Sequence, residues 1–173
     1  MKNIGNMKKL LILLLAFSFN QSLMAQEKRA SPLIEKTENV DNVEVKIQYG
    51  ETSMKGREIF GNLVPYGKVW RTGANEATVI EFNKDVKLNG QLVKAGKYSL
   101  FTVPNEGKWT IIINSIWEQW GAYNYDENKD ILRFEVDSKK AEKHEKLNIH
   151  LSKEGSFQLI WEETSVGFTI SKA

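Results

Sequence analysis

Apolar and polar residues alternate along much of the chain beyond residue 42. The clearest case is residues 43–49, where Val43, Val45, Ile47 and Tyr49 are separated by charged or amide side chains. Because successive side chains of a strand point to opposite faces, this alternation predicts strands with one buried face. About nine short strands are expected, with the hairpin counted once. They lie within residues 43–49, 77–82, 85–93, 98–103, 109–113, 131–137, 147–151, 157–161 and 166–170.

Turn signals separate these stretches, and no long helical period appears. Asn89-Gly90 is the favoured two-residue hairpin connection, because a type I′ turn needs positive φ at both central residues. Residues 51–68 are interrupted by glycines and predict a packed loop, while the charged residues 138–146 predict a solvated turn or a short helix. The sequence therefore predicts an all-β fold, an antiparallel β-sandwich, with a closed β-barrel as the alternative.

The beginning of the chain has the pattern of an export signal. Lys2, Lys8 and Lys9 precede an apolar run over residues 10–19 that is too short to span a bilayer, and Ala25 offers a small residue for cleavage. We therefore expect a protein that is exported, either periplasmic or secreted, with no transmembrane segment after cleavage. The expected parts are a signal peptide over 1–25, a mobile lead-in over 26–42, and a single β-sandwich domain over 43–173.

Composition narrows the classes of function. The 24 basic and 22 acidic residues nearly balance, and three of the basic ones lie in the expected signal peptide. That balance argues against nucleic acid as a partner, which requires an excess of Lys and Arg. The chain has no cysteine, so disulfides, thiol nucleophiles and Cys-based metal sites are excluded. No oligomeric state is predicted.

One short run, at residues 69–76, gathers several kinds of chemistry around a glycine. Arg71 offers a planar fork for a carboxylate, a phosphate or the edge of a sugar. Thr72 and Asn75 can orient a polar ligand, and Glu76 can act as an acid or a base. We expect these residues, together with Trp70, to form the floor of a ligand site.

A structural role for the same run is the alternative. In that case Trp70 packs in the core and Arg71 pairs with an internal carboxylate, because burial of an unpaired guanidinium is too costly. The candidate partners for Arg71 are Glu76, Asp126 and Asp130.

A second irregular stretch, residues 114–129, interleaves aromatic residues with Glu, Gln and Asn. Such a mixture suits the faces and hydroxyls of sugars, or an extended peptide. We expect a wall for the same ligand site, formed by Trp117, Trp120, Tyr123 and Tyr125. The alternative is a loop that these aromatic side chains pin to the sandwich.

Neither a metal site nor a cofactor is expected. Residues 126–130 present oxygens at alternate positions, as calcium loops do, but Ile131 stands where such loops have glycine, and Lys129 adds an unfavourable charge. His144 and His150 fall in a charged turn and on a polar strand face, without a second anchor nearby.

Residues 56–76, which read GREIFGNLVPYGKVWRTGANE, resemble the exported bacterial domain of unknown function numbered 2911. The resemblance continues at VKAGKYSLF (93–101), WGAY (120–123) and DILR (130–133), and covers essentially the whole domain. It implies a secreted or periplasmic β-rich domain, and it implies no activity.

Three functions fit these features. The first is an exported module that binds a small polar or saccharide-like ligand through the floor and wall described above. The second is a hydrolase that uses Glu76 with Asp126 or Asp130, because glycoside cleavage needs two facing carboxylates. The third is an envelope scaffold that binds another protein.

Overall fold

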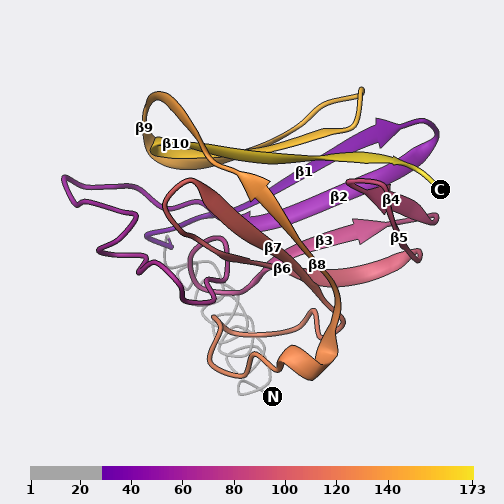
Figure 1. Cartoon of the computed structure of the whole chain (residues 1–173), viewed down its shortest axis with the longest axis horizontal. Coiled ribbons are helices and arrows are strands. Elements are labelled where there is room, and N and C mark those ends of the chain that lie inside the picture. The colour runs from indigo at the N-terminus through magenta and orange to yellow at the C-terminus, as the bar shows by residue number, and fades with distance from the viewer. Residues whose placement is uncertain (1–28) are drawn as a thin grey trace, which may run out of the picture. The chain divides into compact units, whose positions relative to one another are not determined.

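The computed structural model describes residues 29–173, so the predicted signal peptide lies outside the described part of the chain. Ten strands within it form two antiparallel sheets (Figure 1). The larger sheet has the order β1 (Leu33–Val40), β2 (Val43–Gly50), β3 (Thr78–Phe82), β6 (Gly96–Val103), β7 (Lys108–Asn114) and β8 (Asp130–Asp137). The smaller sheet has the order β5 (Gln91–Val93), β4 (Val86–Leu88), β10 (Ser156–Lys172) and β9 (Lys139–Leu151).

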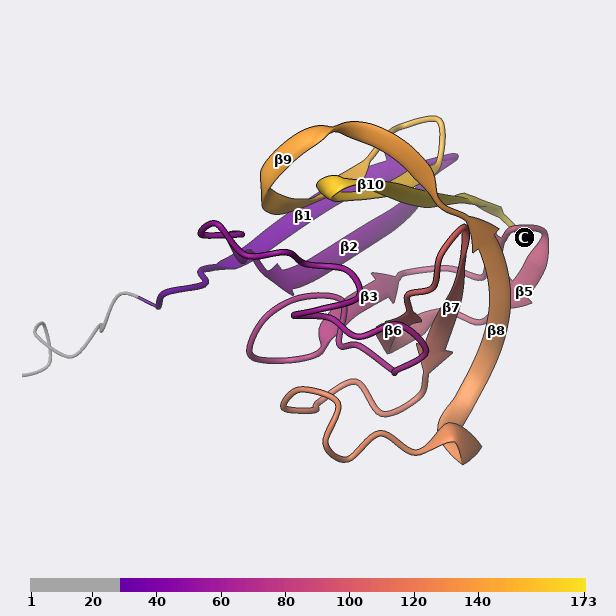
Figure 2. The same ribbon diagram turned by 60° about the vertical axis from the view of Figure 1, so that its left-hand side comes forward.

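The two sheets face each other, with β9 and β10 lying across β1 and β2 (Figure 2). Alternate residues of both sheets point inward, and Ile47 and Ile111 from the larger sheet join Leu159 from the smaller one in a single buried cluster. The predicted antiparallel sandwich is confirmed. The sheets remain separate rather than closing on each other, because β1 and β8 end the larger sheet and β5 and β9 end the smaller one.

The prediction of a mobile lead-in over residues 26–42 is wrong for residues 33–40, which form strand β1. This strand pairs with β2 along its whole length, from Leu33 opposite Gly50 to Val40 opposite Val43. Lys36 reaches the other sheet, where its Nζ donates to Asn148 Oδ1 at 2.8 Å and to the Ile149 carbonyl. Backbone pairing at a sheet edge needs little apolar sequence, so composition alone did not indicate this strand.

Residues 139–146 are also extended rather than a turn or a helix, since they form the first part of β9. They pair with β10, which runs without interruption through the two strands predicted at 157–161 and 166–170. Register shifts on both sides of Glu162, which has φ of 56°, bend this long ribbon. The part of this ribbon that contains residues 139–146 is solvated on both faces. Its sequence therefore lacks the alternation of apolar and polar residues that marks a half-buried strand.

The Asn89-Gly90 hairpin is confirmed. Both residues have positive φ, 45° and 82°, and Leu88 pairs with Gln91 across the turn. The only helical element among the described residues is the 3-10 turn η1 (Glu127–Lys129). No helix in this part of the chain has the length and hydropathy that crossing a lipid bilayer requires.

Candidate functional site

The predicted floor at residues 69–76 lies in the loop that connects β2 to β3, and its backbone is hydrogen-bonded to both β6 and β3. Trp70 pairs with Thr102 of β6 through two backbone hydrogen bonds, of 2.7 and 3.0 Å. At the other end, the Thr78 N–H donates to the Arg71 carbonyl at 3.0 Å. The loop is therefore fixed at both ends to neighbouring positions of one sheet.

Thr72 and Asn75 shape this loop from within. Thr72 is fully buried, and its Oγ1 lies 3.3 Å from the Trp70 carbonyl and 3.1 Å from Thr102 Oγ1. Its φ of 58° is rare for a β-branched residue and persists only where the surroundings hold it. Asn75, with φ of 64°, donates from Nδ2 to the Ser31 carbonyl at 3.2 Å. Both side chains are thus engaged within the protein.

The two irregular stretches lie side by side. Glu76 pairs with Trp120 as an isolated antiparallel bridge, and the Ala77 N–H donates to the Gln119 carbonyl at 3.0 Å. The Gly121 N–H donates to the Asn75 carbonyl, also at 3.0 Å. This contact joins the predicted floor to part of the predicted wall.

A cavity of about 340 Å³ opens where the two stretches meet, and we call it the tryptophan cleft. Trp117 is 39% exposed and Trp120 is 56% exposed, so both indoles remain accessible. Lys97 Nζ lies 3.9 Å from the centre of the Trp117 ring. The charged residues that line the tryptophan cleft, Glu76 and Glu118, are both acidic. The lining residues are Leu33, Gln48, Glu76, Ala77, Val79, Trp117, Glu118, Gln119 and Trp120.

Gln119 contributes an unusual acceptor to the tryptophan cleft. Its Nε2 donates to the Ile116 carbonyl at 2.6 Å, which fixes the orientation of the amide. Its Oε1 is buried and has no hydrogen-bond partner among the described residues. Buried polar atoms are nearly always paired, so this acceptor calls for a donor from outside the described residues, which can be a water molecule or a ligand. The sequence prediction omitted Gln119, although it stands between the two tryptophans.

A second cavity, of about 310 Å³, is lined in part by residues 68–71, 73 and 74, and we call it the basic cleft. The charged residues of its lining are Arg57, Lys68 and Arg71, and none of its lining residues is acidic. Arg57 and Lys68 were not among the predicted site residues, because they lie outside the 69–76 run. The lining residues are Thr52, Arg57, Leu63, Val64, Pro65, Lys68, Val69, Trp70, Arg71, Gly73, Ala74 and Trp161.

Arg71 forms no ion pair with a carboxylate among the described residues. Among residues 29–173 no ion pair includes Arg71, and its Nε is buried without a hydrogen-bond partner. Asp130 instead pairs with Arg133 at 2.9 Å. Arg71 lines the basic cleft, as the site alternative expects, while Trp70 packs in the core, as the structural alternative expects.

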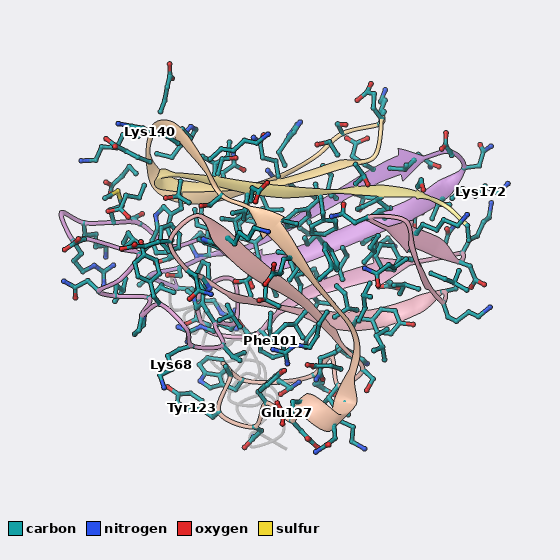
Figure 3. All side chains as sticks on the ribbon, viewed as in Figure 1. Lys68, Phe101, Tyr123, Glu127, Lys140 and Lys172 are labelled. Carbon is teal, nitrogen blue, oxygen red and sulfur yellow. The ribbon has the colours of Figure 1, made fainter. Side chains whose placement is uncertain are left out.

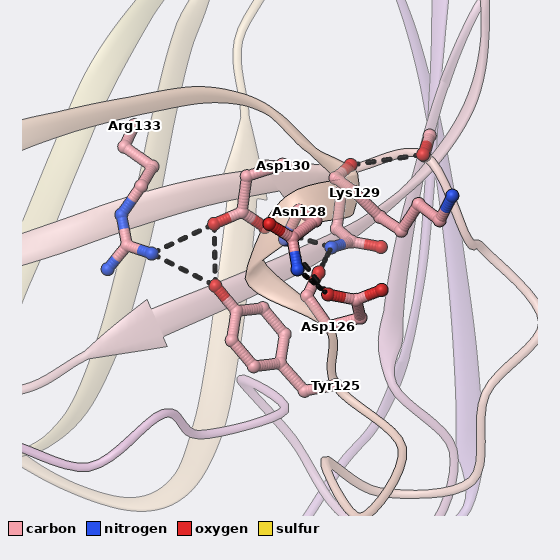
Figure 4. Close-up of polar contacts among 8 residues, drawn as sticks. Tyr125, Asp126, Asn128, Lys129, Asp130 and Arg133 are labelled. Carbon is pink, nitrogen blue, oxygen red and sulfur yellow. Dashed lines mark hydrogen bonds and ion pairs between the residues drawn. The ribbon is translucent and has the colours of Figure 1, made fainter.

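Tyr125 belongs to a polar network rather than to either cleft (Figure 4). Its hydroxyl donates to Asp130 Oδ2 at 2.5 Å and accepts from Arg133 Nη1 at 3.0 Å. Burial, followed by the hydrogen bond to Asp130, raises the pKa of Tyr125 well above its usual range. The ring packs edge-on against Phe101 with centroids 5.1 Å apart, so Tyr125 pins its loop to the sheet.

The carboxylates proposed to partner Glu76 in a hydrolase are also engaged elsewhere. Asp126 Oδ1 accepts from the Asn128 N–H at 2.9 Å and caps η1. Asp130 Oδ1 accepts from Asn114 Nδ2 at 2.8 Å. Neither aspartate lines the tryptophan cleft, so the structure does not assemble either predicted pair there. Within residues 29–173 there is no group of three His, Cys, Asp or Glu residues arranged to hold a metal ion.

Trp70 and Tyr123 occupy opposite environments. Trp70 is buried and stacks on Trp161 with centroids 5.9 Å apart, so its indole is part of the core although it also lines the basic cleft. Tyr123, labelled in Figure 3, is 81% exposed and lines neither of the two clefts. The predicted site is thus divided. Glu76, Trp117 and Trp120 line one cleft, Trp70 and Arg71 line the other, and Thr72, Asn75, Tyr123 and Tyr125 lie outside both.

Comparison with known proteins places the chain in a family. Neither the curated proteins nor the solved structures include a match to it. A family model described as a protein of unknown function, DUF2911, matches residues 31–170, which span almost the entire described domain. This match confirms the resemblance drawn from the sequence, and the chain belongs to the DUF2911 family.

Proposed function

We propose that this protein is an exported binding module whose tryptophan cleft takes a small, uncharged, hydroxyl-rich ligand of the saccharide type. The observation that carries the proposal is the meeting of two accessible indoles, Trp117 and Trp120, with carboxylate and amide acceptors in one cavity. The lysine-rich, apolar beginning of the chain supports export.

The tryptophans supply the apolar part of the recognition. The face of an indole packs against the C–H face of a pyranose ring and loses little conformational freedom in doing so. Trp120 is held at the backbone by its bridge to Glu76, and the ring of Trp117 carries Lys97 on one side. The bridge fixes the backbone from which the Trp120 indole projects, and Lys97 restrains the Trp117 ring, which reduces the entropy lost on binding.

The polar part of the lining selects for hydroxyl donors. Glu76 and Glu118 are acceptors when ionised, and the orphan Oε1 of Gln119 is an acceptor as well. A sugar hydroxyl that donates to Gln119 Oε1 satisfies a buried group that has no partner among the described residues. The Glu118 carboxylate also disfavours an anion at this cleft.

A thermal-shift screen of the protein against neutral mono- and oligosaccharides tests the proposal. A ligand present at a hundred times its dissociation constant adds about 2.7 kcal/mol to the free energy of unfolding. We expect Trp120→Ala to abolish the shift. Tyr123→Ala is the matched control, because it removes an exposed aromatic residue of the same loop that lines neither cleft.

Two results would contradict binding at this cleft. One is the absence of a shift with every saccharide tested, and the other is an unchanged shift in Trp120→Ala. Glu76 and Glu118 line the same cavity, so chromatography of the saccharides after incubation also tests hydrolysis. Cleavage that Glu76→Gln abolishes would assign a hydrolase instead of a binding module.

A further inference from the structure

We infer that the basic cleft is a second binding site, specific for a small organic anion that carries a phosphate or carboxylate group. The site shares no lining residue with the tryptophan cleft, so it does not depend on the function proposed above. Arg71 is the central ligand contact, with Arg57 and Lys68 as the two flanking cations.

The charge of the cleft is the first observation. The charged members of its lining are Arg57, Lys68 and Arg71. Three positive charges around one cavity make its electrostatic potential positive, which attracts anions. Two carboxylates that lie near the lining in sequence have other partners. Glu51 pairs with Lys146 at 2.9 Å, and Glu162 accepts from the backbone N–H groups of Ile59 and Phe60, each at 3.2 Å.

The orphan nitrogen of Arg71 is the second observation. Its Nε is buried and lacks a hydrogen-bond partner among residues 29–173, and no ion pair there compensates the guanidinium. An arginine presents parallel N–H groups that match two oxygens of a carboxylate or a phosphate. An oxyanion at this fork satisfies both the missing hydrogen bond and the missing charge.

Arg57 is held in place for the same task. Its Nε donates to the Met54 carbonyl and its Nη2 to the Ser53 carbonyl, both at 2.8 Å. These two bonds fix the plane of the guanidinium. Lys68 projects from the loop between Tyr66 and Trp70 and forms no ion pair with the described residues (Figure 3). A fixed guanidinium and a free ammonium together supply orientation and attraction.

The size and the remaining walls define the rest of the ligand. A cavity of about 310 Å³ accommodates a small molecule and not a polymer. Leu63, which is 42% exposed, and the exposed Pro65 provide apolar surface beside the three cations. This combination fits an anion with an apolar or flat body.

Calorimetric titration of the whole mature protein at low ionic strength tests the site. The probes are inorganic phosphate, phenyl phosphate, acetate and benzoate, which separate a phosphate from a carboxylate and a bare anion from one with an apolar body. We expect the aromatic anions to bind more tightly. We expect Arg71→Met to weaken binding by about tenfold or more, because hydrogen bonds to charged groups are the strong ones.

Three variants and a control distinguish binding at the basic cleft from nonspecific electrostatic attraction of anions to the protein surface. Lys68→Met is expected to weaken binding several-fold, and Arg71→Lys to retain only part of the affinity, since it keeps the charge and loses the fork. Lys87→Met is the control, because Lys87 is an exposed lysine of β4 that lines neither cleft. An equal loss in Lys87→Met and Lys68→Met would overturn the assignment.

A measurement on the wild-type protein guards against a variant that does not fold. The Nε–H signal of Arg71 in a nitrogen–proton NMR spectrum is expected to shift as phenyl phosphate or benzoate is added, and the shift is expected to saturate. The absence of a saturable shift with all four probes at millimolar concentration would overturn the proposal. Neither result bears on the function proposed for the tryptophan cleft, because that proposal rests on other residues.

Discussion

Ala74 lies directly against Gly50 at the end of β2. The Ala74 N–H donates to the Gly50 carbonyl at 3.1 Å, and a Cβ placed on Gly50 would lie 2.0 Å from the Ala74 carbonyl oxygen. No side chain fits between these two segments. The glycine therefore lets the 71–76 loop dock on the larger sheet, and this docking places Arg71 at one cleft and Glu76 at the other.

Gly50→Ala is expected to destabilise the protein by about 1–3 kcal/mol, because the added methyl group forces the backbone of the loop away. Urea unfolding measures the loss. Gly56→Ala is the control, since a Cβ at that position meets nothing within 4 Å and only its φ of 74° opposes the change. A loss in Gly50→Ala no greater than that in Gly56→Ala would contradict the docking argument.

Gly90→Val is expected to cost on the order of 1 kcal/mol or more, through backbone strain at positive φ. Gly90 has φ of 82° and open space around its Cβ position, so no steric clash contributes. Gly90→Asn should lose less, because asparagine tolerates this conformation. Thermal unfolding of the two variants tests the prediction, and an unchanged melting temperature in Gly90→Val would contradict it.

Tyr125→Phe is expected to lower the free energy of unfolding by about 1–3 kcal/mol, since it removes a hydrogen bond to the charged Asp130, whose side chain is 6% exposed. Binding at the tryptophan cleft should stay unchanged. Chemical denaturation and saccharide titration of the same variant measure both effects. Unchanged stability with lost binding would instead make Tyr125 a ligand contact.

Arg71→Met is expected to lower the free energy of unfolding by no more than about 0.5 kcal/mol, or to raise it. No internal carboxylate pairs with Arg71 in the described residues, so its removal leaves no buried charge alone. Denaturant unfolding provides the measurement. A loss of about 3–5 kcal/mol would reveal a buried partner and contradict the cleft assignment.

Asp85 gives the stability of the 85–95 hairpin a dependence on pH. A hydrogen bond from Lys94, at 2.8 Å, and one from the Ala95 N–H, at 2.9 Å, lower the pKa of Asp85 below its ordinary 3.8. A lowered pKa in the folded state means that the stabilisation is complete above 3.8 and is lost as the pH falls through the folded value. Asp85→Asn should therefore flatten the fall in melting temperature below pH 4. An identical acid profile for the two proteins would rule out this contribution.

Local patterns in the sequence determined the fold class and most of the strands. The alternation at 43–49 and the Asn89-Gly90 pair act within a few residues, through the two-residue period of a strand and the positive φ of a tight turn. Such features need no knowledge of what lies across the domain. The residue types at 69–76 likewise favour a bend, and this run is a loop that precedes β3.

The tertiary structure decided the features that depend on contacts between segments far apart in the sequence. Strand β1 forms because its backbone pairs with β2, and backbone groups are the same in every sequence. Arg71 and Glu76 are five residues apart, yet the docking of Ala74 on Gly50 sends them to different clefts. Arg57 joins Arg71 only when the loop closes, and Gln119 joins Glu76 only when two segments pair. These long-range contacts decide which residues line each cleft, and the spacing of residues along the chain does not encode them.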